Sequence, residues 1–104
     1  MSATPFFAML VWHAIADYPL QGEFLARAKN PATQTTEIPW WQALGAHAVI
    51  HAGGVAFITG SLWLGLAEFV SHALIDDSKC RGRIGYNTDQ ALHVACKAVW
   101  ALFI

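Results

Sequence analysis

Histidine and acidic residues recur four positions apart along this chain of 104 residues. The pairs are His13 with Asp17, His47 with His51, His72 with Asp76, and Asp89 with His93. Residues four apart lie on one face of a helix, one turn apart, so each pair can present two ligand atoms to one point. Imidazole and carboxylate groups are ligands for zinc, manganese and iron. The spacing therefore predicts a divalent transition-metal centre holding two ions, with all eight residues as ligands.

Three other polar residues are expected to act beside these pairs. Glu68 precedes His72 by one helical turn on the same face, which suits a general base or a further ligand. Gln21 and Gln90 neighbour predicted ligands in the sequence, and we expect them to orient those ligands through hydrogen bonds.

Helices must position these side chains, and the sequence divides into four of them in a single domain, 1–104. They are expected at residues 5–18, 39–58, 61–79 and 88–104. Pro5 and Pro39 suit first helical turns, while Gly60 and Ser61 supply a stop and a new cap. Residues 21–37 read as a polar loop with one short helical turn around 22–28. The prediction is an all-α, up-down four-helix bundle with its polar layer at one end.

Composition limits the environment and the partners of the bundle. Hydrophobic residues make up 56% of the chain and charged residues 12%, with a net charge of −1. The apolar excess predicts a membrane-embedded bundle that contacts lipid, with a soluble oligomer as the alternative. The absence of a basic field argues against nucleic acid. The two cysteines are too few for a disulfide scaffold and are expected to be free thiols.

Basic residues gather in the loops at the same end as the predicted ligands. Lys79, Arg81 and Arg83 follow the His72 pair closely and are expected to bind an anionic substrate. In a bacterial inner membrane these basic loops would lie on the cytoplasmic side.

The order of the motifs resembles a domain-of-unknown-function family of small bacterial and phage membrane proteins. The matching segments are HAIADYPLQ at 13–21, Lys29, HAVIH at 47–51, SHALIDDSK at 71–79 and DQALH at 89–93. The resemblance implies a short polytopic membrane protein and carries no established activity.

The function expected from these residues is metal-dependent hydrolysis of a phosphoester or another small anionic substrate at the membrane's cytoplasmic face. One alternative is a non-catalytic, metal-stapled protein that acts as a homo-oligomer or binds a host envelope protein. Another is a non-haem di-iron oxidase, although such enzymes use more carboxylates than this sequence offers.

Overall fold

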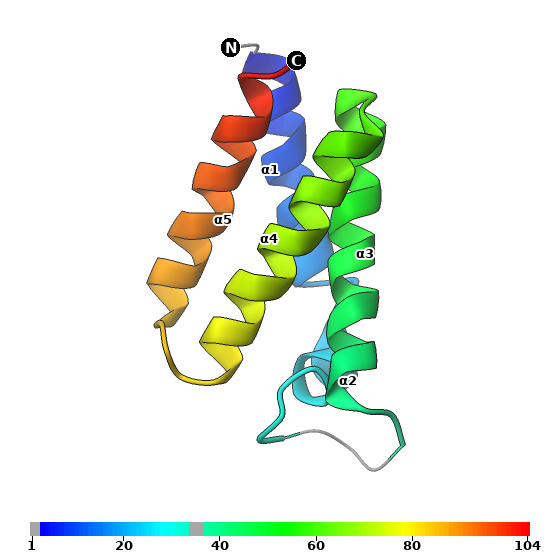
Figure 1. Cartoon of the computed structure of the whole chain (residues 1–104), viewed down its shortest axis with the longest axis vertical. Coiled ribbons are helices and arrows are strands. Elements are labelled where there is room, and N and C mark those ends of the chain that lie inside the picture. The colour runs from blue at the N-terminus through cyan, green and yellow to red at the C-terminus, as the bar shows by residue number, and fades with distance from the viewer. Residues whose placement is uncertain (1–2, 34–36) are drawn as a thin grey trace.

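The computed structural model describes residues 3–33 and 37–104, and the secondary structure of those residues is entirely helical (Figure 1). Its helices are α1 (Ala3–Asp17), α2 (Gly22–Ala28), α3 (Trp40–Thr59), α4 (Leu62–Cys80) and α5 (Tyr86–Ala101). The four long helices run alternately down and up, and α2 lies against α3 at the lower end in Figure 1. The predicted all-α class is confirmed. A fifth helix, α2, stands where a single turn was expected, and residues 34–36 of the predicted loop lie outside the described residues.

Local sequence signals explain the helix boundaries. Gly60 adopts a left-handed φ of 71° and ends α3, a conformation that costs glycine little. The Ser61 side chain then accepts a hydrogen bond from the Leu64 amide at 3.2 Å and caps α4. Pro39 precedes α3 with extended backbone, whereas α5 begins after Gly85, two residues earlier than expected. These caps fix where along each helix the polar pairs fall.

The prediction of a membrane-embedded protein with cytoplasmic loops is wrong. Among the described residues, no helix combines the length and the apolar character needed to cross a bilayer. Helices α1 and α5 have 15 and 16 residues, and α4 carries four charged side chains within its 19 residues. Helix α3 has 20 residues, but His47 and His51 interrupt its apolar stretch. The overall excess of apolar residues therefore misled the prediction, because the polar pairs are spread over every long helix.

The interior of the bundle is unusually polar. Its apolar core is a small cluster of Met9, Val55 and Ala101, which come from α1, α3 and α5. Buried hydrophobic residues are mostly alanines, whereas the buried polar residues are large. They are His13, Lys29, His47, His51, Glu68, His72, Asp76, Asp89, His93 and Lys97. Since buried polar groups are costly unless paired, the contacts among these residues decide the stability of the fold.

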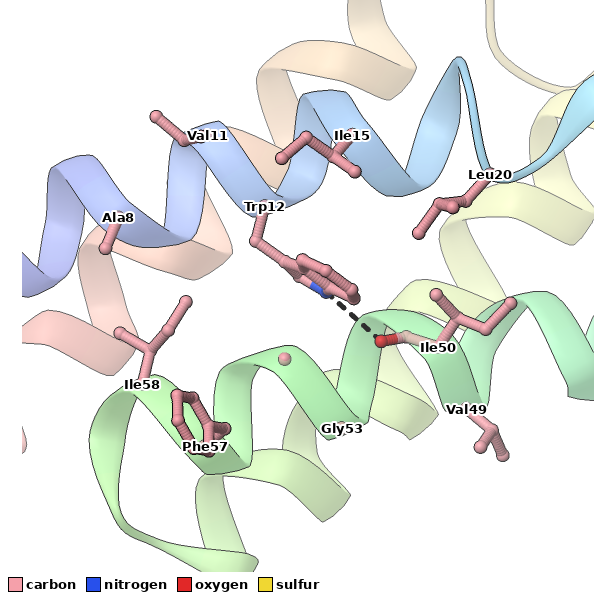
Figure 2. Close-up of a pocket in the computed structure, with 11 residues that line it drawn as sticks. Ala8, Val11, Trp12, Ile15, Leu20, Val49, Ile50, Gly53, Phe57 and Ile58 are labelled. Atoms are coloured by element: carbon pink, nitrogen blue, oxygen red, sulfur yellow. Dashed lines mark hydrogen bonds between the residues drawn. The ribbon is translucent and has the colours of Figure 1, made fainter.

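An apolar groove of about 780 Å³ runs along the outside of the bundle between α1 and α3 (Figure 2). Trp12 lies across it and donates a hydrogen bond from Nε1 to the Ile50 carbonyl at 3.1 Å. Gly54 has no side chain where the indole packs, and a Cβ there would overlap the ring. Phe57 lines the groove and is 89% exposed. We refer to this surface as the α1–α3 groove.

Candidate metal centre

All five imidazoles meet inside the bundle, and together with Asp17 they are called the imidazole cluster here. His13 comes from α1, His47 and His51 from α3, His72 from α4 and His93 from α5. Neighbouring ring centroids lie between 3.7 and 6.2 Å apart. His72 is at the centre, stacked at 3.7 Å on His51 and at 4.2 Å on His93. The spacing of four places each pair on the inner face of its helix, and the alternating helix directions bring the pairs to one level.

Asp17 lies between His13 on one side and His47 and His51 on the other, and a different oxygen faces each side. Its Oδ1 accepts from His47 Nε2 at 3.1 Å and from His51 Nε2 at 2.8 Å. Its Oδ2 lies 3.2 Å from His13 Nε2. A carboxylate in this position can bridge two cations about 3.5–4 Å apart, the separation found in two-metal sites.

Two overlapping groups of side chains have the geometry to hold an ion. Asp17, His47, His51 and His72 form one group, and His13, His72 and His93 form the other. In each group one ligand atom per residue lies within 4.8 Å of the others. His72 belongs to both, but its Nδ1 is hydrogen-bonded to Glu68, so one ring nitrogen remains for one ion.

The protonation states in the imidazole cluster suit cation binding. Burial lowers the pKa of His51 to about 4 and that of His72 to about 2, and it also lowers the pKa of His13. Burial raises the pKa of Asp17, but hydrogen bonds from His47 and His51 outweigh this effect and hold it well below its usual range. Neutral imidazoles and an ionised carboxylate are the forms that bind metal ions.

Asp76 is close to the imidazole cluster but is held by lysines. Its Oδ2 accepts from Lys29 Nζ at 2.6 Å, and its Oδ1 lies 3.4 Å from Lys79 Nζ. The same Oδ2 is 3.7 Å from His47 Nε2. As the structure stands, Asp76 therefore neutralises two buried or half-buried ammonium groups and contacts the cluster only at its edge.

Asp89 and Gln90 border the cluster on α5. Asp89 Oδ1 lies 3.4 Å from His93 Nε2, and the carboxylate also receives a hydrogen bond from Gln90 Nε2 at 3.0 Å. Gln90 Oε1 is 3.1 Å from His13 Nε2, so this amide contacts residues of both α1 and α5. Gln90 therefore contacts side chains on both helices, and its predicted orienting role stays a prediction. Gln21 instead donates to the main-chain oxygen of Asp17 at 3.0 Å.

Glu68 is completely buried, and both of its oxygens are engaged. Oε2 lies 3.1 Å from His72 Nδ1 and accepts from Lys97 Nζ at 2.8 Å. Oε1 accepts from Trp100 Nε1 at 3.0 Å. Burial raises the pKa of Glu68, but these hydrogen bonds and the charge of Lys97 outweigh it and hold the pKa well below its usual range. This arrangement favours an orienting role for Glu68 over the predicted role of general base.

The structure separates the three residues predicted to bind substrate. Lys79 reaches the polar region, since its Nζ lies 3.8 Å from Asp89 Oδ2, and its side chain is 27% exposed. Burial lowers its pKa, but the charges of Asp76 and Asp89 raise the pKa by more. Arg81 pairs instead with Asp77 and lies over the Trp40 ring, and Arg83 is exposed.

Three residues that complete the polar interior were not among the sequence-predicted site residues. They are Lys29, Lys97 and Trp100. Lys97 follows His93 by one helical turn and therefore shares its inner face, a signal that the sequence does contain. Lys29 directly follows α2, so its place in the interior depends on how α2 packs. The spacing of residues in the sequence does not predict that packing.

Comparison with known families adds one finding to this geometry. Residues 6–104 match the family described as Protein of unknown function (DUF3307). The chain belongs to this family. The match confirms the resemblance to a domain-of-unknown-function family, and it spans every residue of the imidazole cluster. No curated protein and no solved structure was found to match the chain.

Proposed function

We propose that this DUF3307 chain is a metal-dependent hydrolase that uses two divalent ions to cleave a phosphoester or a related anionic substrate. The supporting observation is the Asp17 carboxylate, whose two oxygens face different imidazole sets. In this proposal Asp17, His47 and His51 would hold one ion, and His13 and His93 would hold a second ion together with Asp17. Zinc, manganese and iron suit this ligand set.

The residues of the chain supply distinct parts of such a reaction. Paired divalent ions activate water and neutralise charge on an anionic substrate. Lys79, which carries its charge at the partly exposed edge of the site, would receive a substrate oxygen. Gln90 holds Asp17 and Asp89 in place through its amide. Asp89, whose Oδ1 is buried without a hydrogen-bond partner, would complete the ligand set beside His93.

Metal analysis of the purified protein is the first test. Protein prepared without added metal should carry about two transition-metal ions per chain, and it should hydrolyse members of a panel of phosphomonoesters, phosphodiesters and nucleotides. Asp17→Asn keeps the shape of the side chain but removes the bridging charge, and it should reduce both metal content and turnover. Asp77→Asn is the matched control, because Asp77 lies on the surface in an ion pair with Arg81. A protein without stoichiometric metal that leaves the whole panel intact would contradict the proposal.

The burial of the imidazole cluster favours a second candidate, a metal centre with a purely structural role. The five imidazoles are at most 5% exposed, and structural metal sites are typically closed. Metal content without turnover, combined with unfolding of the bundle on chelation, would support this candidate over the hydrolase.

A further inference from the structure

His72 turns its Nδ1 toward a carboxylate, whereas His47 and His51 turn Nε2 toward Asp17 and leave Nδ1 buried without a hydrogen-bond partner. Its Nδ1 lies 3.1 Å from Glu68 Oε2, whereas its Nε2 is buried without a hydrogen-bond partner. The ring is stacked between His51 and His93, so it cannot turn without displacing both neighbours. A neutral imidazole carries one proton, and the nitrogen without that proton is the one that can bind a cation.

The partners of Glu68 decide which nitrogen carries the proton. A lysine ammonium and an indole N–H can only donate hydrogen bonds, so Lys97 and Trp100 each require an acceptor from Glu68. Glu68 is completely buried and has no water-facing oxygen. With the charge of Lys97 2.8 Å away, the carboxylate stays an acceptor toward His72 as well. His72 Nδ1 must then be the donor.

We propose that Glu68, fixed by Lys97 and Trp100, is a positioning residue that holds His72 as its Nδ1–H form and leaves Nε2 free to bind a divalent cation. The benefit of this arrangement rests on the metal centre of the proposed function. The arrangement itself is a property of the metal-free protein, so it can be tested separately. Histidine ligands commonly donate their second ring N–H to a carboxylate, which fixes the ring and raises the basicity of the ligand nitrogen.

Nuclear magnetic resonance of the metal-free wild-type protein tests the tautomer directly. With ¹⁵N-labelled histidine, the His72 ring should show a protonated Nδ1 and an unprotonated Nε2, assigned by loss of its signals in His72→Gln. A protonated Nε2 at His72 would overturn the proposal. This measurement remains decisive if the wild-type protein binds no metal, an outcome that would reject the proposed function alone.

Three variants separate two roles of Glu68, which are to orient His72 and to neutralise Lys97. Lys97→Met removes the cation that keeps Glu68 an acceptor toward His72, so thermal stability should fall and Zn²⁺ affinity should fall with it. Glu68→Leu removes the acceptor and should weaken Zn²⁺ binding by about 10–100-fold. The double variant Glu68→Leu/Lys97→Met removes both buried charges, so stability should recover while Zn²⁺ affinity stays low.

The double variant decides between the two roles. Wild-type Zn²⁺ affinity in that protein would show that Glu68 only neutralises Lys97, and the proposal would fail. The visible spectrum of bound Co²⁺ should also change in both variants that lack Glu68, because the coordination of the ion changes with the His72 ring. Asp77→Leu is the control for removal of an acidic residue from α4 at a half-buried site outside the polar interior. If Glu68→Leu alone does not fold, the double variant and the wild-type spectra still give the answer.

Discussion

The imidazole cluster lies on the inner side of α1 and α3, and the α1–α3 groove lies on their outer side. Inside the bundle, α1 and α3 present His13, Asp17, His47 and His51, all paired with other polar groups. Outside, the same helices present an apolar groove crossed by Trp12, with one hydrogen bond to the main chain. In most domains the apolar face points inward, because burial of apolar surface drives folding. Here the inner face carries paired polar side chains, so changes in the interior should disturb pairing and changes in the groove should disturb packing alone.

The largest expected effect is the loss of a buried charge partner. Lys97→Met leaves Glu68 in the interior without its cation, and it should lower the free energy of unfolding by about 3–5 kcal/mol. Arg81→Met breaks the surface pair with Asp77, and it should cost about 1 kcal/mol or less. Denaturant unfolding measures both. Equal losses would contradict the contrast between interior and surface.

The second-largest effect is expected from acid, which should lower the free energy of unfolding of the metal-free protein. Burial lowers the pKa of His51 from 6.5 to about 4, so between these values the unfolded chain binds a proton that the folded chain excludes. Stability is therefore fully present above pH 6.5 and falls as the pH drops, by about 3 kcal/mol for His51 alone. The lowered pKa values of Asp17 and Glu68 act in the same direction at lower pH. Unfolding measured across this range should be less pH-dependent in His51→Gln, and an unchanged slope there would count against this role for His51.

Two neighbouring glycines test packing at the groove. Gly54→Ala places a methyl group against the Trp12 indole and should destabilise the protein by about 1–3 kcal/mol. Gly53→Ala meets no atom within 4 Å and should stabilise α3 by about 0.5–1 kcal/mol, because alanine is the better helix former. Thermal unfolding compares the two variants. Similar effects would show that Trp12 does not occupy the space above Gly54.

The smallest effect is expected at the outer edge of the groove. Phe57 is 89% exposed, so Phe57→Ser should change stability by no more than about 0.5 kcal/mol and leave metal content unchanged. Metal analysis alongside thermal unfolding tests this. A loss of bound metal would show that the groove and the imidazole cluster are coupled across the helices.

The sequence was sufficient for the four long helices and for the convergence of the five histidines with Asp17. Gly60, Ser61 and Pro39 mark helix ends through local conformational preferences, and a spacing of four assigns each pair to one helix face. The burial of Lys29 against Asp76 was not predictable, because it depends on how α2 packs on α3. The contacts of Glu68 with Lys97 and Trp100 depend on how far α5 is shifted along α4. The loop between the two helices sets this shift, and the periodicity of the sequence does not predict it.

Because His72 lies at the centre of the cluster, two metal ions would bind one after the other with different affinities. Its single available nitrogen lies within reach of both ligand groups, so the two positions compete for it. The first ion to arrive would take His72 and leave the second with a poorer set of donors. A calorimetric titration with the metal ion would then show two binding steps of unequal affinity. Protein isolated under metal limitation would carry one ion in nearly every molecule.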